Sequence, residues 1–351
     1  MAQSQSIAFH AELTQMVREL GVSHFSVVPP EALSQARTNA SERTGGLGID
    51  VRAIDATPVI TRVEPGSAAE QAGIKPGFIL ERVDELAVDA GNLGAAQTAM
   101  LGSVGSEARL TFRSGDGSVR TKTLKRSPRS GEFYSMKVLG VTVKSVPPQY
   151  GELEAKRIQD NVGYLRFTRF IPALVPRLKE AIGSMAGAPG LIIDLRGNPG
   201  GEDEVGVALA NLLVEKKSVF MITRKRSGAH TYAVHPQGRR FKGPLVILLD
   251  GISASASEQF AAGMQELGRA VVVGERSAGR DLDATIMRLP SGGVFQYAYG
   301  EPRTPKGVVI EGRGVIPDVE VGLKRADLLR GVDTQVEAAV RAVKSATPRQ
   351  S

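Results

Sequence analysis

The spacing of hydrophobic and polar residues predicts a helix and a strand at the start of this chain. Between residues 8 and 20 the apolar residues recur on one helical face, and Gly21 ends the predicted helix. Residues 22–28 then predict a short strand, which ends at a pair of prolines. The polar residues 31–44 predict a turn-rich linker.

Residues 45–126 predict a compact module rich in strands and turns. An Asp-Gly pair at 116–117 separates two strand-like runs, which is typical of a hairpin. The other predicted parts are a glycine-rich turn at 45–49, strands at 59–63 and 74–84, and short helices at 68–72 and 93–101.

From residue 162 onward, buried strands alternate with helices. The strands are predicted at 162–167, 191–195, 244–249 and 270–274, and the helices at 172–185, 202–214 and 259–267. Two further strands flank a basic hairpin, and residues 324–345 predict a helical tail. This alternation predicts an α/β core whose functional residues lie at strand ends.

The turn between strand 244–249 and the helix after it carries a candidate nucleophile, Ser255. A serine there lies beside the free N–H groups of a helix, which stabilise an oxyanion. The same residues also fit a capping box, because Glu258 follows Ser255 at the S-x-x-E spacing. On this segment alone the cap is the favoured interpretation, because cap motifs are common and nucleophiles are rare; the rest of the chain reverses that order.

Composition narrows the class of protein. The chain has 351 residues, a mass of 37.2 kDa and 42% apolar residues, which predicts a globular protein of two domains. It has no apolar run of about 18 residues and no leader-like N-terminal segment, so the chain as given is expected to be soluble. The absence of cysteine excludes disulfides, thiolate metal ligands and a cysteine nucleophile.

The four histidines do not have metal-ligand spacing, so we expect no metal and no other cofactor. His10 is expected on an exposed helix face, and His230 and His235 fall in the basic hairpin. The formal charge is +7, with basic clusters near 216–217, 224–226 and 239–242. Such clusters attract nucleic acid or anionic lipid, but the aromatic residues are not interleaved with them. We therefore interpret them as a solvated face and expect no nucleic-acid partner.

Four motifs in a fixed order carry a family resemblance. They are DLRGNPGG at 194–201, SASASE at 253–258, VGERSAG at 273–279, and TPKG at 304–307 with EGRGVIPD at 311–318. This series resembles the C-terminal processing (tail-specific) serine proteases and their tricorn-core relatives. Upstream, GLGI at 46–49, PGSAA at 65–69 and GIKPG at 73–77 resemble a PDZ domain.

The resemblance covers residues 20–322 and implies the fold class α/β, with a crotonase/ClpP-like protease core and an inserted PDZ-like β-rich domain. The implied domains are 1–44 (helix and strand of the core), 45–126 (PDZ-like), 127–323 (protease core) and 324–351 (C-terminal helix and tail). Similar proteases use a serine–lysine dyad. Here Arg280 occupies the lysine position and Ala284 the position of a family glutamine. Arginine stays protonated and cannot act as a general base.

The tricorn-core resemblance implies another base. These proteases use a Ser-His motif upstream of the PDZ module and a glutamate before the stretch that ends in Pro-Asp. The matching residues are Ser23, His24 and Glu311. His24 is then the base for Ser255, and Ser23 and Glu311 orient the imidazole. A histidine base suits neutral pH, and a triad does not depend on chain order.

Two backbone sites complete the expected machinery. The N–H of Ala256 and an N–H of Gly200 or Gly201 would form the oxyanion hole, although 198–201 also fits an ordinary strand-to-helix turn. In the PDZ-like module, the N–H groups of 47–49, contributed by Leu47, Gly48 and Ile49, would hold a peptide C-terminus. The alternative is a rigid spacer that binds nothing.

The leading hypothesis is a serine endopeptidase that cleaves unstructured or C-terminal segments of a polypeptide substrate through an acyl-enzyme. The second is a catalytically inactive peptide-binding protein, suggested by Arg280 and Ala284. The third is a hydrolase of small esters or peptides. Similar proteases are commonly exported, so an extracytoplasmic location is expected, with the numbering starting inside a longer precursor. The oligomeric state stays open.

Overall fold

The computed structural model describes residues 3–39, 43–135, 137–138, 141–142 and 147–346. The chain divides into two compact units. The larger comprises Met1–Gln35, Gly131–Val321 and Ala338–Ser351, and the smaller comprises Ala36–Ser130 and Gly322–Glu337. Among the described residues, no helix is long and apolar enough to cross a membrane.

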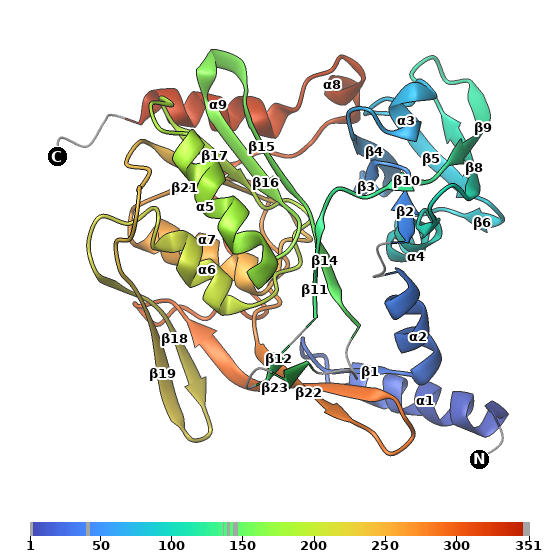
Figure 1. Ribbon diagram of the computed structural model, residues 1–351, viewed down its shortest axis with the longest axis horizontal. Coiled ribbons are helices and arrows are strands. Elements are labelled where there is room, and N and C mark those ends of the chain that lie inside the picture. Colours follow the sequence, from blue (N-terminus) through green and yellow to red (C-terminus); the bar gives the residue numbers. More distant parts are fainter. Residues whose placement is uncertain (1–2, 40–42, 136, 139–140, 143–146, 347–351) are drawn as a thin grey trace. The chain divides into compact units, whose positions relative to one another are not determined.

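A six-stranded sheet forms the centre of the larger unit (Figure 1). Five of its strands are parallel and β15 pairs antiparallel with β16. In spatial order the strands are β15 (Leu153–Arg157), β16 (Gly163–Phe167), β17 (Leu191–Asp194), β20 (Leu245–Leu249), β21 (Val271–Gly274) and β24 (Val319–Glu320). β16, β17 and β20 are buried along their whole length, as continuous apolar runs in a parallel sheet require. The predicted α/β class is confirmed.

Three helices pack in succession against this sheet (Figure 1). They are α5 (Val175–Ser184), which follows the 3-10 turn η2 (Pro172–Leu174), α6 (Asp203–Ala210) and α7 (Ala256–Glu266). α6 ends earlier than the predicted 202–214. Phe170 and Phe260 are fully buried between these elements, with ring centroids 6.1 Å apart. This apolar layer fixes the strand ends and helix starts that carry the site.

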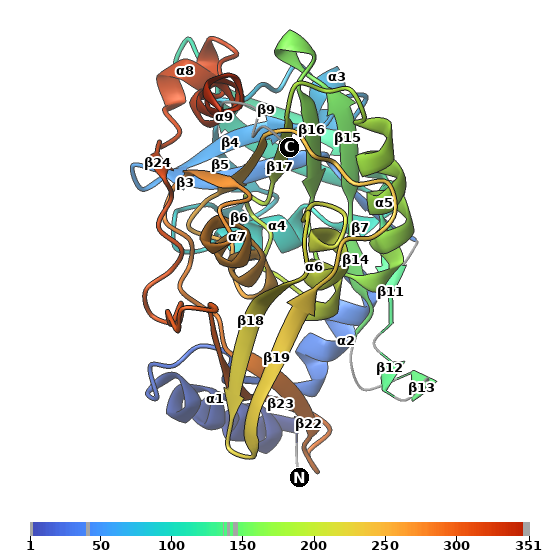
Figure 2. The ribbon, with the colours of Figure 1, turned by 90° about the vertical axis from the view of Figure 1, so that its left-hand side faces the viewer.

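A second sheet of long hairpins extends from the larger unit (Figure 2). Its strands are β1 (Ser26–Val28), β18 (Ser218–Lys225), β19 (Gly228–Val234), β22 (Asp283–Arg288) and β23 (Val294–Arg303). β18 and β19 form the predicted basic hairpin. β22 and β23 had no counterpart in the predicted elements. β1 pairs antiparallel with β23, with Ser26 opposite Gln296. The pairing thus joins two segments that are about 270 positions apart in the sequence.

Two predictions for the N-terminal region are wrong. The expected linker 31–44 contains a helix, α2 (Pro30–Asn39), which proline opens and which buries Leu33. His10 lies in α1 (Gln3–Arg18), but it is only 2% exposed and its Nε2 is 2.9 Å from Ser291 Oγ. The turn between β22 and β23 covers it, which helical spacing alone does not reveal.

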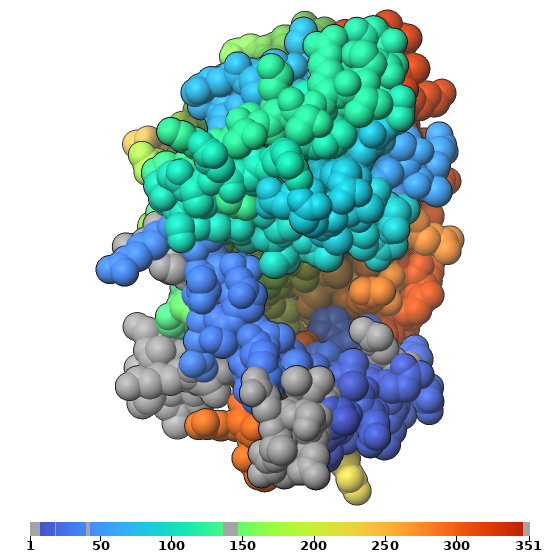
Figure 3. All heavy atoms as spheres, turned by 90° about the vertical axis from the view of Figure 1, so that its right-hand side faces the viewer, coloured from blue at the N-terminus to red at the C-terminus, as the bar shows by residue number. Residues whose placement is uncertain are grey.

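The smaller unit is a β-rich body, and the spheres of its first segment run from blue to green in Figure 3. Its main sheet has the order β3-β4-β5-β8-β9, with β6 beside β5, and it encloses a core that includes Val51, Ile60 and Leu110. The elements are β3 (Ile49–Ile54), β4 (Thr57–Val63), α3 (Ala68–Gln71), β5 (Ile79–Val83), β6 (Leu86–Ala87), α4 (Leu93–Ala99), β8 (Glu107–Arg113) and β9 (Val119–Lys125). The predicted hairpin at 116–117 joins β8 to β9.

The remaining elements are short or terminal. A small sheet has the order β10 (Ser127–Pro128), β2 (Thr44–Gly46) and β7 (Gly102–Ser103). Two further pairs are β11 (Glu132–Tyr134) with β14 (Gln149–Gly151) and β12 (Lys137–Val138) with β13 (Val141–Thr142), and η1 spans Gln159–Asn161. The predicted tail helix 324–345 is two helices, α8 (Arg325–Leu329) and α9 (Thr334–Ser345).

Candidate active site

Ser255 stands at the sharp turn between β20 and α7. Its backbone has φ 54° and ψ −125°, a region that residues with a side chain rarely adopt. Strained residues of this kind concentrate at functional sites, because the surrounding structure must hold them. The side chain is half-buried and lies at the N-terminus of α7, where the helix dipole is positive.

The buried carboxylate of Glu258 holds this turn in place. Its Oε2 accepts the backbone N–H groups of Ser255 at 3.1 Å and Arg280 at 2.9 Å. Its Oε1 accepts the Ser277 hydroxyl at 2.5 Å and the Gly279 N–H at 2.7 Å. Burial raises the pKa of Glu258, and these hydrogen bonds act in the opposite direction. The capping interaction with Ser255 is therefore present, and it coexists with the strained serine.

The glycine-rich turn after β17 packs directly against Ser255. A Cβ on Gly200 would lie 2.7 Å from Ala254 O and 2.9 Å from Ala256 N, so only glycine fits there. The fully buried Asn198 supports this approach. Its backbone oxygen accepts the Ser257 hydroxyl at 2.9 Å, and its side chain donates to Phe167 O at 2.9 Å.

The backbone N–H groups of this region differ in what they bind. Gly200 N donates to Asn198 Oδ1 at 2.9 Å. Within residues 147–346, which the structure describes without a gap, the N–H groups of Gly201 and Ala256 have no hydrogen-bond acceptor. Of the two glycines predicted as alternatives for the oxyanion hole, Gly200 therefore has an N–H that is already hydrogen bonded, and Gly201 does not.

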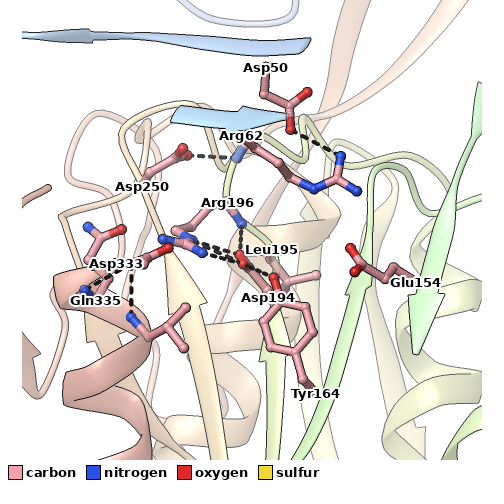
Figure 4. Close-up of polar contacts among 12 residues, drawn as sticks. Asp50, Arg62, Glu154, Tyr164, Asp194, Leu195, Arg196, Asp250, Asp333 and Gln335 are labelled. Carbon is pink, nitrogen blue, oxygen red and sulfur yellow. Dashed lines mark hydrogen bonds and ion pairs between the residues drawn. The ribbon is translucent and has the colours of Figure 1, made fainter. Parts of the chain in front are cut away.

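A buried charge network anchors the start of the same turn (Figure 4). Asp194 accepts the Tyr164 hydroxyl at 2.6 Å and Arg196 Nη2 at 2.6 Å. Burial acts to raise the pKa of Asp194, but the positive charges of Arg196 and Arg166 outweigh it and hold that pKa at about 2. The carboxylate is thus ionised at neutral pH and fixes the direction in which the chain leaves β17.

Ser23, His24 and Glu311 form a second hydrogen-bonded group. Glu311 accepts the Ser23 N–H at 3.1 Å through Oε1 and the Ser23 hydroxyl at 2.8 Å through Oε2. Ser23 Oγ lies 2.7 Å from His24 Nδ1. His24 itself has φ 60°, which places a second non-glycine residue of the site in the left-handed region. The structure thus brings together the three residues that the sequence singled out.

The segment 279–283 links this group to the serine turn. Arg280 O accepts the Ser255 N–H at 2.8 Å, and Asp281 N donates to Glu311 Oε2 at 2.6 Å. Burial lowers the pKa of His24; Glu311 and Asp283 act to raise it, and Arg280 adds to the lowering. Among the described residues, no hydrogen bond joins the His24 ring to the Ser255 hydroxyl.

Arg280, at the position predicted for the family lysine, donates its backbone N–H to Glu258, while its side chain is exposed. Ala284 lies on β22, opposite Ala298. His230 lies on β19, and His235 follows that strand, as predicted for the basic hairpin. No group of three or more His, Cys, Asp or Glu residues that could hold a metal ion occurs in the part of the chain that the structure describes.

In the smaller unit, the residues predicted to bind a peptide C-terminus lie where β3 begins. Gly48 has φ 73°, and a Cβ on it would lie 2.3 Å from Ser67 Cβ. Its carbonyl accepts the Glu64 N–H at 2.8 Å, and the Leu47 carbonyl accepts the Ala69 N–H at 3.4 Å. Ile49 starts β3, which is an edge strand of its sheet.

Residues 161–321 match the family model described as peptidase family S41. The chain is 27% identical over 311 residues to the carboxyl-terminal-processing protease of Picosynechococcus sp., covering 87% of this chain and 70% of that protein. It is also 27% identical over 311 residues to the carboxy-terminal processing protease CtpA of Bacillus subtilis, covering 88% of this chain and 62% of that one.

Solved structures share the fold. The photosystem II D1 C-terminal processing protease matches with a TM-score of 0.60 and 24% identity, over 96% of this chain and 86% of that one. A protein described as an S41 protease from Bacteroides fragilis matches with a TM-score of 0.61 and 16% identity, over 94% and 88%. The matched family and the similar proteins indicate a serine-type peptidase with an α/β core. Residues 161–321 thus match peptidase family S41, and over most of its length the chain is similar to carboxyl-terminal processing serine proteases.

Proposed function

We propose that this chain is an endopeptidase that cleaves unstructured or C-terminal protein segments, with Ser255 as nucleophile and His24 as its base. The observation that carries the proposal is the hydrogen-bonded group Glu311–Ser23–His24. Through Asp281 and Arg280, it is joined to the backbone of Ser255. The family's lysine is replaced by arginine, so a base from elsewhere in the chain is needed.

The hydrogen bonds support one tautomer of His24. An ionised Glu311 only accepts, so the single hydroxyl proton of Ser23 is donated to it. Ser23 Oγ must then accept from His24 Nδ1–H, which leaves Nε2 with the lone pair of a base. Burial, which lowers the pKa of His24, further favours the neutral ring before reaction.

The proposed reaction proceeds in two halves. His24 Nε2 takes the proton of Ser255 Oγ as the oxygen attacks the peptide carbonyl, and later gives that proton to the leaving amine. Water then attacks the acyl-enzyme with the same base. A rotation of the ring or a small shift of the N-terminal segment must bring Nε2 to Ser255, because catalytic contacts often tighten only with substrate bound. The carboxylate of Glu311 stabilises the imidazolium through Ser23.

The N–H groups of Ala256 and Gly201 form the proposed oxyanion hole. Ala256 follows Ser255, and Gly201 follows Gly200, which packs on the serine turn; neither N–H has an acceptor within the continuous range 147–346. In this arrangement Gly200 serves close packing, since its own N–H is bound to Asn198. Preorganised backbone donors of this kind are worth about 10²–10³ in kcat each.

The smaller unit is proposed to be PDZ-like and to bind a peptide C-terminus. β3 has a partner strand on one side only, and α4 packs beside it. An extended peptide would add to that edge as a strand, with its carboxylate at the N–H groups of 47–49. A peptide-binding assay with a free C-terminus and its amide would test this, since only the free carboxylate should bind.

An active-site fluorophosphonate probe tests the catalytic proposal directly. Wild-type protein should be labelled on Ser255, and Ser255→Ala should not be. Equal labelling of both would refute the assignment. A specific observation favours the second candidate, a non-catalytic peptide-binding protein: His24 and Ser255 are not hydrogen bonded within the described residues. Peptide affinity without labelling or turnover would favour that candidate.

A further inference from the structure

Beside the proposed catalytic residues lies a group of buried acids that the mechanism does not use. Asp281 is fully buried and Asp283 is 5% exposed. Within the continuously described range 147–346, no hydrogen bond of ordinary geometry reaches either carboxylate oxygen of Asp281 or Oδ2 of Asp283, although Gln259 lies beside Asp281 and the carboxyl group of Asp203 lies beside Asp283. The hydroxyl of Thr223, also fully buried, is likewise without one. Buried polar groups in proteins are almost always satisfied, so these atoms point to a partner that the chain itself does not supply.

Asp281 and Asp283 are connected to the segment around Ser255 by one peptide bond and one hydrogen bond. Asp281 follows Arg280, whose carbonyl accepts the Ser255 N–H at 2.8 Å. Gln259, one helical turn beyond Ser255 in α7, donates from Nε2 to Asp283 Oδ1 at 3.3 Å. Asp281 is therefore adjacent in sequence to a residue that is hydrogen bonded to Ser255, and Asp283, at the start of β22, is hydrogen bonded to the helix that Ser255 precedes.

The same group reaches the solvent through α6. Asp203, the first residue of that helix, comes two residues after Gly201 and is half-buried. Burial raises the pKa of Tyr232 and of Tyr299, and the charges of Asp203 and Asp283 raise both further. Tyr299 is 43% exposed and Asp203 itself is half-buried, so solvent reaches the Asp203 end of the group.

Thr223 and Asp283 flank a common glycine. A Cβ on Gly300 would lie 2.6 Å from Thr223 Cγ2 and 3.4 Å from Asp283 Oδ2. The unpartnered hydroxyl and the unpartnered carboxylate therefore belong to one place in the fold, between β18, β22 and β23.

We propose that Asp203, Asp281 and Asp283 form a substrate subsite for a cationic side chain, lysine or arginine, next to the peptide bond that is cleaved. This inference rests on the proposed function, because it takes Ser255 as the reacting residue. Lysine and arginine bring only donors, on a long apolar stem that can reach buried acceptors. A metal ion fits less well, since the described residues contain no cluster of three or more ligands arranged to hold one.

The charges around the subsite favour a cation. The titratable groups that interact electrostatically with these aspartates or with their neighbour His24 are the acids Glu202, Asp203, Glu204, Glu258, Asp281 and Asp283, the phenols Tyr232 and Tyr299, and the basic groups His24 and Arg280. Burial raises the pKa of Asp281, as do the charges of Glu258 and Asp203. Burial likewise raises the pKa of Asp203, as does Asp283. A bound cation would offset this repulsion and release a proton, so its binding should tighten as pH rises.

The test compares two peptides that differ at one position, lysine against the uncharged norleucine of similar length. Both are titrated into the Ser255→Ala protein by calorimetry, with a series that places the variable residue at successive positions. At one position the lysine peptide should bind at least tenfold more tightly. Asp281→Asn and Asp283→Asn, each in the Ser255→Ala background, should reduce that preference. The exposed Glu180→Gln, a matched loss of one negative charge, should leave it unchanged.

Equal affinity for the two peptides at every position would overturn the subsite, whatever the aspartate variants do. So would a lysine preference that persists in folded Asp281→Asn and Asp283→Asn proteins. Because Ser255→Ala cannot turn over, these results do not depend on the base. A lysine preference in binding without labelling of wild type by the fluorophosphonate probe would leave the subsite intact and remove the proposed catalysis.

Discussion

The serine turn and the histidine segment reach their geometry by different routes. At the serine turn, Glu258 holds Ser255 across three residues of sequence, and the flanking strand and helix are strong local elements. At the histidine segment, Ser23 and His24 depend on Glu311, which is 288 residues from Ser23 along the chain. The nucleophile is therefore held by Glu258 three residues away together with segments 20–60 residues distant, whereas the proposed base depends on a contact across almost the whole chain. Substitutions should accordingly affect the two halves of the site in different ways.

The largest effect is expected from removing the proposed base. His24→Ala should lower kcat by about 10⁴-fold or more, as loss of a triad member does. Arg280→Ala should leave most activity, because arginine takes no proton. Single-turnover kinetics on an unstructured peptide would measure both. Restored or increased activity in Arg280→Lys, with His24→Ala still active, would show that a lysine base operates and that the histidine assignment is wrong.

Loss of the long-range contact should come next. Glu311→Gln keeps the shape but removes a charge, and its amide group would face the N–H groups of Ser23 and Asp281. We expect kcat to fall by about 10²-fold, with a smaller loss of unfolding free energy than at the fully buried Glu258, because Glu311 is only partly buried. The exposed Glu320→Gln is the matched control. A Glu311→Gln enzyme with wild-type kcat would separate Glu311 from catalysis.

The equivalent change at the serine turn should affect stability. Glu258 is fully buried and accepts four hydrogen bonds, so an amide in its place leaves donors facing one another. Glu258→Gln should lower the free energy of unfolding by about 2–3 kcal/mol. Urea denaturation monitored by circular dichroism measures this. Unchanged stability together with lost activity would mean that the two carboxylates have the same role and that the contrast drawn above is false.

Relief of backbone strain should give a smaller effect of opposite sign. Glycine adopts φ 54° with ψ −125° more readily than alanine does. Ser255→Gly should therefore be more stable than Ser255→Ala by about 1 kcal/mol. Thermal melts of the two inactive proteins side by side test this, and a more stable alanine variant would argue against strain at the turn.

The smallest effect concerns pH. Burial lowers the pKa of His24, and the positive charge of Arg280 lowers it a little further. The imidazole must be neutral to act as a base. Activity should therefore persist below the pH at which an ordinary histidine becomes charged. Removing the positive charge in Arg280→Ala should raise the pKa of His24 and move the acid limb of the kcat/KM profile to higher pH. A limb that stays in place would exclude His24 as the titrating group.

Much of the site was predictable because its motifs are local. The buried strands, the serine turn and the Asn198 turn follow from apolar runs and glycine positions, and Ser23, His24 and Glu311 were found through family resemblance. The buried acids were missed. Asp281 and Asp283 look like loop residues in the sequence, and the one available signal was their position just after Arg280. The burial of His10 and the helix α2 were also missed, because both depend on chain segments far away.

By itself, the sequence determined the α/β class and the place of Ser255 between a strand and a helix, because apolar periodicity and turn residues act over a few positions. Only the tertiary structure decided that β1 pairs with β23, that Glu311 holds Ser23, and that the carboxylates of Asp281 and Asp283 are buried. These outcomes depend on strand register and on the desolvation of groups brought together from opposite ends of the chain. No local pattern encodes that environment, and it is the environment that sets the chemistry of a histidine or an aspartate.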